Sequence, residues 1–459
     1  MDVLRKYLLL LIVGSLPACY EGASDKFLPD ETIVNTDDEE EDEDERVKEQ
    51  NRWTYKQMEN DYLWEEYLPD TSTLSFSEYP KQFFDNLLYE GDRFSWIEPN
   101  TDVETYSLYD QYGLDYATYQ TAGGELVHRV LLVRKDTRAR KAGLKRGDWF
   151  KIADDSGKGI TLIKGNMEGE VFYPHQPIPL QAETEEYTRS VLLDSVYQIE
   201  DRKIAYLFYN EFNDGGSLIY NPYREELKAV FTRFGQQEAT DLIVDLRYNP
   251  GGYVSICQYL GSLILPDEYL GEISGYHSYN KKRAALQYER TGNEEEILFF
   301  LGKNIIDGNN LGLGKAYFII TRHTASASES LINSLSPFVG VVKIGSTSTG
   351  KGVGSWTIQS RQYEWQLQPI TFRFYNRDHE TIPDGGLTPD IFVDETQAGT
   401  LYELGDTREL LLSTALDEIM GQRLKSARIG EKTNLRPIDR DISARRKVKG
   451  YIDNSYKLH

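Results

Sequence analysis

The sequence predicts an α/β protein with three folded parts, and three patterns along the chain carry this prediction. Strand-like apolar runs alternate with helical patterns over residues 196–420, which is typical of a largely parallel sheet covered by helices. Short strand-like runs with glycine turns fill residues 105–195. Aromatic residues at helical spacing mark residues 51–104 as a small helical domain. A chain of 459 residues is long enough to need more than one core.

The first 18 residues have the pattern of a secretory signal peptide. Arg5 and Lys6 precede an apolar run, residues 7–16, and Leu16-Pro17-Ala18-Cys19 follows. Ten residues are too few to cross a bilayer, which takes about 20. Cysteine directly after the cut resembles the lipidation site of bacterial lipoproteins, although Pro17 is unusual there. We therefore expect a lipid anchor on Cys19 and a place in the bacterial cell envelope, on the outer membrane.

Charge is distributed unevenly along the chain. The net charge is −23, and the nine consecutive acids of residues 37–45 supply much of it. Residues 19–50 are expected to form an extended, disordered acidic linker, because like charges repel. Nucleic acid is an unlikely partner for so acidic a chain, since phosphate contacts need clustered Lys and Arg. Residues 421–459 form a basic tail with eleven Lys or Arg and four acids. We expect this tail to be solvated and partly ordered; folding back onto the acidic body and contact with anionic surfaces are the alternatives.

The elements of residues 51–420 follow from apolar periodicity. Two helices are expected in the first domain, around residues 53–68 and 75–88. Residues 267–313 interrupt the later alternation and are interpreted as an insertion or a lid. Cys257, the other cysteine, lies on a core helix, where a structural role is expected. The expected strands are 204–208, 242–246, 317–321 and 339–344, and the expected helices are 224–234, 253–264, 327–335 and 407–420, the last capped by Asp406.

The segment Thr324-Ala325-Ser326-Ala327-Ser328-Glu329 and the later Gly350-Lys351-Gly352 suggest a catalytic pair. Small residues around Ser326, at a strand-to-helix junction, leave room for a substrate carbonyl. A serine hydroxyl needs a neighbour that removes its proton. Lys351 can do so as a neutral amine, if burial lowers its pKa by several units. By itself, the serine segment could also be an ordinary helix start with a polar cap.

Further segments agree with the catalytic interpretation. The strand Asp241–Leu246 leads into Asn249-Pro250-Gly251-Gly252, where paired glycines bring backbone N–H groups close to a ligand. The other segments are Tyr112-Gly113-Leu114-Asp115, Ala142-Gly143-Leu144-Lys145-Arg146-Gly147-Asp148 and the loop 384–391.

Together these motifs resemble the carboxyl-terminal processing, or tail-specific, proteases, a family of serine peptidases. The resemblance covers roughly residues 105–420. It implies a ClpP/crotonase-like core of ββα units over residues 196–420 and a PDZ-like domain over residues 105–195. It further implies that Ser326 is the nucleophile, that Lys351 is the general base, and that Gly251, Gly252 and Ala327 supply oxyanion N–H groups. Residues Tyr112, Gly113, Leu114 and Asp115 correspond to the loop that would bind a substrate carboxylate.

One position departs from the family pattern. A glutamine often follows the lysine by four residues and orients it, whereas this chain has Ser355 there. Ser355 could serve as a weak orienting group, and Gln359 could reach the lysine if the turn carries an insertion.

The predicted function is cleavage of unfolded or C-terminally exposed polypeptides by a Ser–Lys dyad, without a metal or other cofactor. Three alternatives remain open. His323, three residues before Ser326, could act as the base. The chain could be a non-catalytic, lipid-anchored peptide-binding protein. The third alternative, metal-dependent hydrolysis, has the least support, because the sequence contains no His-Glu-x-x-His motif or comparable ligand cluster. The sequence does not indicate the oligomeric state.

Overall fold

The computed structural model describes residues 36–100, 108–155, 159–182, 189–214 and 221–421, together with 435, 437 and 438. The chain divides into two compact units, residues 1–45 and 46–459. Within the described residues, no helix combines the length and the apolar character needed to cross a membrane. The signal-peptide prediction and Cys19 lie outside the described residues.

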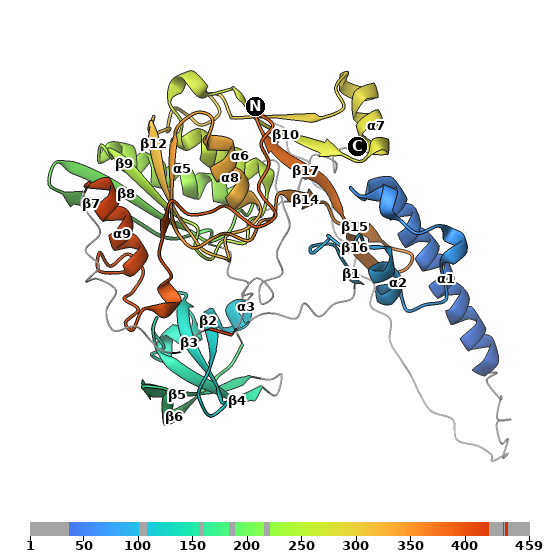
Figure 1. Ribbon diagram of the computed structural model, residues 1–459, viewed down its shortest axis with the longest axis horizontal. Coiled ribbons are helices and arrows are strands. Elements are labelled where there is room, and N and C mark those ends of the chain that lie inside the picture. Colours follow the sequence, from blue (N-terminus) through green and yellow to red (C-terminus); the bar gives the residue numbers. More distant parts are fainter. Residues whose placement is uncertain are drawn as a thin grey trace, which may run out of the picture. The chain divides into compact units, whose positions relative to one another are not determined.

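A six-stranded sheet forms the centre of the larger unit, with strand order β18-β13-β12-β9-β8-β7 (Figure 1). All neighbouring strands pair in parallel except β7 with β8. The strands are β7 Val191–Ile199, β8 Arg202–Tyr209, β9 Asp241–Asp245, β12 Lys315–Ile320, β13 Gly340–Gly345 and β18 Ile391–Phe392.

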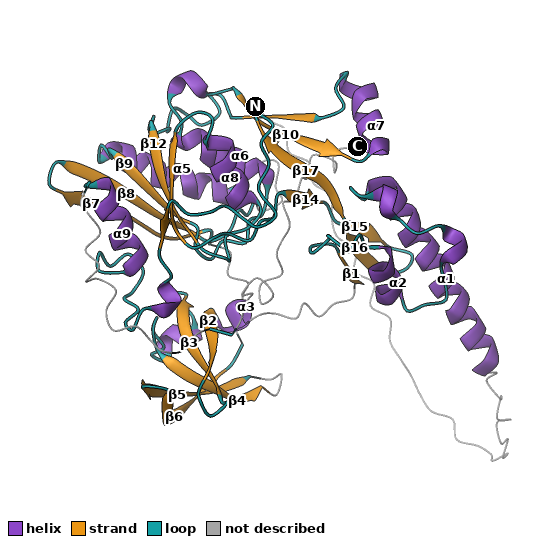
Figure 2. Cartoon of the chain, viewed as in Figure 1, coloured by secondary structure: helices purple, strands orange, loops and turns teal. Residues whose placement is uncertain are grey.

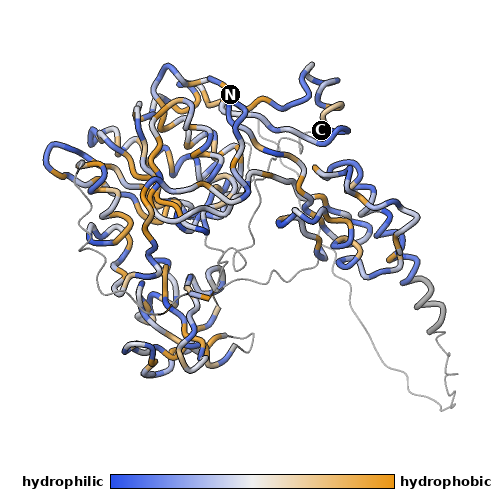
Figure 3. The backbone as a smooth tube through the Cα atoms, viewed as in Figure 1, coloured by the Kyte–Doolittle hydropathy of each residue, from blue (hydrophilic) through white to orange (hydrophobic). Residues whose placement is uncertain are grey.

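The alternation of side chains along each strand assigns the two faces of this sheet to two apolar cores. In β8, Ala205 and Leu207 join one core, while Ile204 and Tyr206 join the other. The first core contains side chains of α5 Pro222–Gln236, α6 Val254–Ile264 and α8 Ala327–Leu335. The second contains side chains of α9 Leu410–Ile419. Apolar residues concentrate along these central strands (Figure 3). The expected α/β architecture is confirmed.

A second sheet, with order β11-β10-β17-β14, contains much of the segment interpreted as an insertion or lid. β10 Ile273–Tyr279 pairs with β17 Ile370–Asn376, so residues of the interruption are built into a sheet with later strands. The helix α7 Lys281–Thr291 connects β10 to β11 Glu296–Phe299, and β14 is Val353–Ser355. The lid interpretation finds no support in this arrangement, because β10 is a central strand of the sheet.

The first domain is built from two distant parts of the chain. α1 Thr36–Asp61 and α2 Pro80–Leu87 accompany a three-stranded sheet of order β1-β16-β15. In it, β1 Trp96–Pro99 pairs with β16 Trp365–Gln368, which pairs with β15 Ile358–Ser360. Leu367 is fully buried in the same apolar cluster as Phe83 and Phe84 of α2. The hairpin from residue 358 to residue 368 therefore completes a domain that the sequence placed entirely before residue 105.

Residues 108–182, here called the β-rich module, form a five-stranded antiparallel sheet of order β2-β3-β4-β5-β6 (Figure 2). β2 is an edge strand. Two helices occur in the module's described residues, α3 Leu108–Tyr112 and α4 Arg138–Lys141, and both are short. The strands are β2 Leu114–Gln120, β3 Leu126–Val133, β4 Trp149–Asp155, β5 Ile160–Glu168 and β6 Val171–Leu180.

The structure differs from the sequence-based boundaries at three places. Residues 36–50 belong to α1 and are helical, where an extended linker was expected. Glutamate has good helix propensity, and acids near a helix N-terminus interact favourably with its dipole. The start of β7 at Val191 assigns the end of the predicted 105–195 domain to the central sheet. Glu409, not Asp406, caps the last helix, because its side chain accepts from Leu412 N.

Candidate active site

Three turns meet at one edge of the central sheet. They follow β9, β12 and β13, which are adjacent parallel strands and therefore end at the same edge. The turn after β9 contains Gly251, the turn after β12 contains Ser326, and the turn after β13 contains Lys351. The fold thus brings the sequence-predicted residues of the catalytic pair and the glycine turn to one place.

Ser326 occupies a strained position directly before helix α8. Its φ of 58° and ψ of −117° are unusual for a residue with a side chain. The residue is fully buried, and its Oγ has no hydrogen-bond partner among the residues that the structure describes. A buried hydroxyl without a partner is costly. The hydroxyl is therefore held ready to bond to a group that the described chain does not supply.

Backbone contacts hold the Ser326 turn in place from both sides. Ala325 N donates to Asn249 O at 3.1 Å, which ties the turn to the one after β9. Thr349 N donates to Thr324 O at 3.0 Å, which ties it to the turn after β13. The backbone around Ser326 is therefore anchored independently of the serine side chain.

Glu329, one turn into α8, joins the serine segment to the lysine turn. One carboxylate oxygen accepts from Ser326 N at 2.9 Å and from Lys351 N at 2.8 Å. The other accepts from Gly350 N at 2.7 Å and from Ser348 Oγ at 2.5 Å. Burial raises the pKa of the Glu329 carboxyl, and these four hydrogen bonds act in the opposite direction. Glu329 therefore fixes the relative positions of the Ser326 and Lys351 backbones.

Lys351 is almost completely removed from water, with 2 % of its surface exposed. Burial lowers the pKa of its amine from 10.5 to about 8, while the charges of Asp92 and Glu329 act to raise it. No ion pair involving Lys351 occurs among the described residues. A lowered pKa is what a lysine needs to accept a proton near neutral pH.

The segment Asp92–Ser95 of the first domain forms one wall of the lysine site. The Lys351 Nζ lies 5.0 Å from the centre of the Phe94 ring. Arg93 donates to Gly350 O at 3.0 Å and to Asp384 O at 3.2 Å. Asp92 accepts from Phe94 N, from Ser95 N and from the Tyr62 hydroxyl. The first domain therefore contributes directly to the burial and the electrostatics of Lys351.

The glycine turn lies directly against Ser326. A Cβ atom on Gly251 would lie 2.8 Å from Ser326 Cβ and 2.9 Å from Ala327 N, and φ of Gly251 is +105°. The Gly251 N–H donates to Asn249 Oδ1 at 2.9 Å, so this predicted oxyanion donor is already engaged. Ala327 is the first residue of α8, so its N–H has no partner within the helix. Ala327 and Gly252 therefore remain the better candidate donors.

Neither predicted orienting residue forms a hydrogen bond to Lys351 among the described residues. Ser355, on β14, accepts from Gln368 Nε2 at 2.7 Å, and no hydrogen bond joins it to Lys351 within the described chain. Gln359 pairs with Gln366 on the exposed hairpin at 3.1 Å, so the suggestion that it reaches Lys351 is wrong. β15 turns away into the first domain's sheet, which the sequence did not indicate.

Two other residues considered from the sequence, His323 and Cys257, are both buried. His323 is buried, and its Nε2 lies 3.3 Å from Arg322 Nε. The described hydrogen bonds include none between His323 and Ser326. Cys257 is buried on α6, and its Sγ lies 3.5 Å from Ala327 O, with its pKa raised by burial. This buried position beside Ala327 is consistent with the structural role expected for Cys257.

Residues Tyr112, Gly113, Leu114 and Asp115 lie in the β-rich module, where Tyr112, Leu114 and Asp115 are each at most 2 % exposed. Gly113 has φ of +68°, and a Cβ there would lie 2.4 Å from Thr137 Cγ2. Gly113 O accepts from Arg134 N at 2.9 Å. The segment is packed into the module's own core, and its predicted role in binding a carboxylate stays a prediction.

A buried network of charges connects the β-rich module to the central sheet. Arg146 pairs with Glu395 at 2.5 Å and donates to the Tyr248 hydroxyl at 2.8 Å. Arg247, at the end of β9, pairs with the same Glu395 at 2.8 Å and with Glu409. All these charges are paired and hydrogen-bonded, as burial requires. Tyr248 immediately precedes Asn249, so the network ends at the glycine turn.

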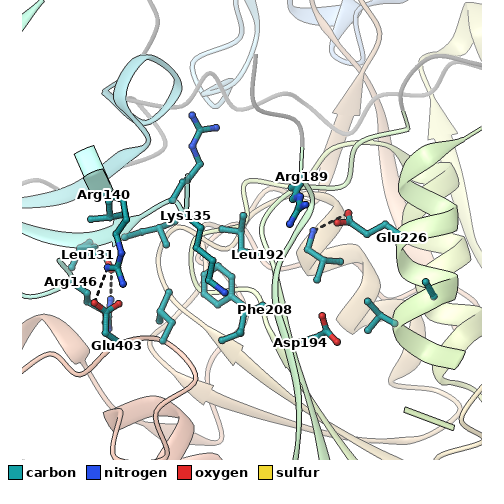
Figure 4. Close-up of a pocket in the computed structure, with 18 of the residues that line it drawn as sticks. Leu131, Lys135, Arg140, Arg146, Arg189, Leu192, Asp194, Phe208, Glu226 and Glu403 are labelled. Atoms are coloured by element: carbon teal, nitrogen blue, oxygen red, sulfur yellow. Dashed lines mark hydrogen bonds and ion pairs between the residues drawn. The ribbon is translucent and has the colours of Figure 1, made fainter. Parts of the chain in front are cut away.

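One cavity of about 560 Å³ lies between the β-rich module and the central domain, and none of its lining residues belongs to the serine–lysine site (Figure 4). Among the charged residues of its lining the basic ones outnumber the acids, but several are paired with acids. Arg140 pairs with Glu403 at 3.0 Å, and Arg233 pairs with Asp194 at 2.6 Å. These pairs neutralise much of the positive charge, so the lining gives no clear indication of an anionic ligand.

Sequence reasoning missed the contributions of Asp92, Phe94 and Glu329. Glu329 was visible only as a typical first-turn acid of a helix. Its distance of more than 20 residues from Gly350 and Lys351 gave no indication that it would bind their N–H groups. Asp92 and Phe94 reach the lysine only through the fold.

Comparisons with known proteins agree with this architecture. Residues 203–393 match Peptidase family S41, and residues 49–96 match the Peptidase S41 N-terminal domain. A structure from Bacteroides fragilis NCTC 9343, named as an S41 protease, has a TM-score of 0.69 and 24% identity. That likeness covers 80% of this chain and 97% of the other. It shows a shared fold.

A second solved structure, the photosystem II D1 C-terminal processing protease, has a TM-score of 0.47 and 14% identity, covering 77% of this chain and 95% of that one. The two family matches contain the three turns of the site and the segment Asp92–Ser95 that covers Lys351. This chain belongs to peptidase family S41 and is a serine-type peptidase.

Proposed function

We propose that Ser326 and Lys351 are the catalytic pair of this peptidase and that it cleaves extended segments of unfolded or C-terminally exposed polypeptides. The observation that carries the proposal is the burial of Lys351, with a pKa lowered to about 8, in a turn that Glu329 fastens to the Ser326 segment. Serine and base must be held in a fixed geometry for proton transfer to accompany attack.

The reaction proceeds by acyl transfer. Neutral Lys351 takes the proton from Ser326 Oγ as that oxygen forms a bond to the substrate carbonyl carbon. The N–H groups of Ala327 and Gly252 stabilise the negative oxygen of the tetrahedral intermediate. The lysine ammonium then gives its proton to the leaving amine as the peptide bond breaks. Water, deprotonated by the same lysine, hydrolyses the ester and restores the serine.

An unfolded protein such as casein tests this function directly. Wild type, Ser326→Ala and Lys351→Ala should be compared after removal of residues 1–18, with circular dichroism as a check on folding. Cleavage by wild type alone supports the proposed pair. Full activity of either variant would refute it. The family assignment favours this enzyme over a non-catalytic peptide-binding protein, the alternative left open by the sequence.

A His323→Ala variant separates the lysine from the remaining histidine alternative. It should keep most of the activity, because no described contact joins His323 to Ser326. Loss of activity with an unchanged melting temperature would instead favour a histidine base.

For location, we propose a lipid anchor on Cys19 and attachment to the bacterial outer membrane. The support is the signal pattern of residues 1–18 followed by Cys19. Labelled palmitate should be incorporated into wild type in bacterial cells, and a Cys19→Ser variant should remain unlabelled. Equal labelling of both would contradict the assignment.

A further inference from the structure

The loop 384–391, one of the motifs of the sequence, packs against the lysine turn. Leu387 N donates to Ser348 Oγ at 2.7 Å, and Ser348 N donates to Leu387 O at 3.2 Å. A Cβ atom on Gly350 would lie 2.2 Å from Asp384 O, so the two backbones approach there as closely as only glycine allows. None of the catalytic groups lies on this loop, so its place beside the lysine turn needs another explanation.

Arg93 of the first domain connects the lysine turn to this loop. Its Nη2 donates to Gly350 O at 3.0 Å, in a partly buried bond, and to Asp384 O at 3.2 Å, in an exposed one. On the other side of the turn, Lys351 N donates to Glu329 at 2.8 Å. The C=O of Gly350 and the N–H of Lys351 belong to one peptide group. This group is therefore held at its oxygen by Arg93 and at its nitrogen by Glu329.

A tight turn presents the Arg93 side chain. The Asp92 carboxylate accepts from Phe94 N at 2.8 Å and from Ser95 N at 3.0 Å, which closes the turn around Arg93. Ser95 Oγ accepts from Ile370 N at 2.8 Å, at the start of β17. The guanidinium lies 4.7 Å from the centre of the Phe94 ring, which restrains its direction. The arginine is thus placed over the lysine turn by its own backbone and by a strand of the second sheet.

We propose that Arg93 is a positioning residue for Lys351 and that it acts by fastening the lysine turn to the loop 384–391. The peptide group between Gly350 and Lys351 can rotate when the bond to its oxygen is lost. This rotation changes the direction in which the lysine side chain leaves the backbone, and with it the distance from Nζ to Ser326 Oγ. A misplacement of about 1 Å can lower a rate about 100-fold. The consequence for cleavage rests on the proposed function, whereas the contact itself does not.

The first domain thereby has a direct part in the reaction. Arg93 lies within residues 49–96, which match the Peptidase S41 N-terminal domain. Its side chain reaches a glycine that follows it by 257 residues in the chain. Cleavage therefore requires this domain to be docked against the central domain, and loss of the arginine contact should lower kcat without any change in the nucleophile.

Two substitutions of Arg93 test this role with a quenched fluorescent peptide as substrate. Arg93→Leu removes both bonds and keeps an apolar stem, whereas Arg93→Lys keeps a cation that can donate to Gly350 O. Arg93→Leu should lower kcat about 10- to 100-fold and Arg93→Lys about two- to fivefold, each with little change in KM. Arg138→Leu is the matched control, because it removes an arginine bond to a backbone carbonyl, Ala182 O at 2.7 Å, in the β-rich module. Its kcat should remain within about twofold of wild type.

Hydrogen exchange measured by mass spectrometry tests the contact between Arg93 and the lysine turn without any substrate. Arg93→Leu should speed exchange at residues 348–352 and 384–387, and Arg138→Leu should leave both segments unchanged. Wild-type kcat in every folded Arg93 variant would overturn the proposal, as would a lower kcat without faster exchange at residues 348–352. If circular dichroism shows that Arg93→Leu is unfolded, Arg93→Lys decides by the same two criteria. A wild-type protein that cleaves nothing would refute the proposed function, and the exchange result would still decide the contact.

Discussion

The protonation of Lys351 should set the pH dependence of cleavage. With a pKa of about 8, the neutral fraction of the amine is about 9 % at pH 7 and about 91 % at pH 9. The rate with a subsaturating substrate should therefore rise about tenfold between these values and level off above them. A lysine at its ordinary value of 10.5 would instead give a rise of about 100-fold over the same range, without levelling off.

A continuous assay with a quenched fluorescent peptide, at constant ionic strength from pH 6 to pH 10, measures this profile. The variant Asp92→Asn tests whether Lys351 sets this profile, because the Asp92 charge acts to raise the pKa of Lys351. The asparagine oxygen can still accept from Phe94 N and Ser95 N. The rising limb of this variant should move to lower pH. A flat profile in wild type, or an unchanged limb in Asp92→Asn, would refute the assignment of the limb to this lysine.

The same pKa has a consequence for stability. The unfolded lysine titrates near 10.5 and the folded one near 8, so the folded state binds the proton less tightly. The resulting penalty is fully present below pH 8 and disappears as the pH rises to about 10.5. Lys351→Met should therefore raise the free energy of unfolding by about 3 kcal/mol at pH 7, with little gain at pH 10.5. Urea unfolding at the two pH values measures the difference, and an equal effect at both would contradict it.

Three further variants test the other parts of the site. Glu329→Gln should lower kcat about 10- to 100-fold, because the amide NH₂ cannot accept from the N–H groups that the carboxylate binds; kcat equal to that of wild type would contradict this role. Phe94→Ala should admit water to Lys351 and move the rising limb of the pH profile to higher pH, and a limb that stays in place would exclude the ring from this effect. Gly251→Ala should abolish cleavage, because its Cβ would meet Ser326, whereas Gly143→Ala, with a similar φ of +87° and no atom within 4 Å, should remain active. Equal activity of the two alanine variants would mean that the contact with Ser326 does not matter.

The central elements were predictable because their signals are local. The helix expected at residues 327–335 has those bounds, and the strand expected at 242–246 is β9 Asp241–Asp245. Their apolar runs are bounded by glycine, proline or small polar residues, which end elements wherever the chain folds. The acidic residues 36–50 were harder, because charge repulsion favours an extended chain while glutamate favours a helix. In the structure these residues are helical and belong to α1.

The sequence alone identified Ser326 and Lys351 as the chemically interesting pair, because a serine among small residues and a lysine between glycines are local patterns. Only the tertiary structure decided what surrounds them. The wall formed by Phe94 and the four bonds accepted by Glu329 join segments that lie far apart in the chain. The same holds for the hydrogen bond from Ile438 N to Thr118 O, since no periodicity connects these two residues. Contacts of this kind depend on which surfaces the fold brings together, and a single sequence carries no local signal for them.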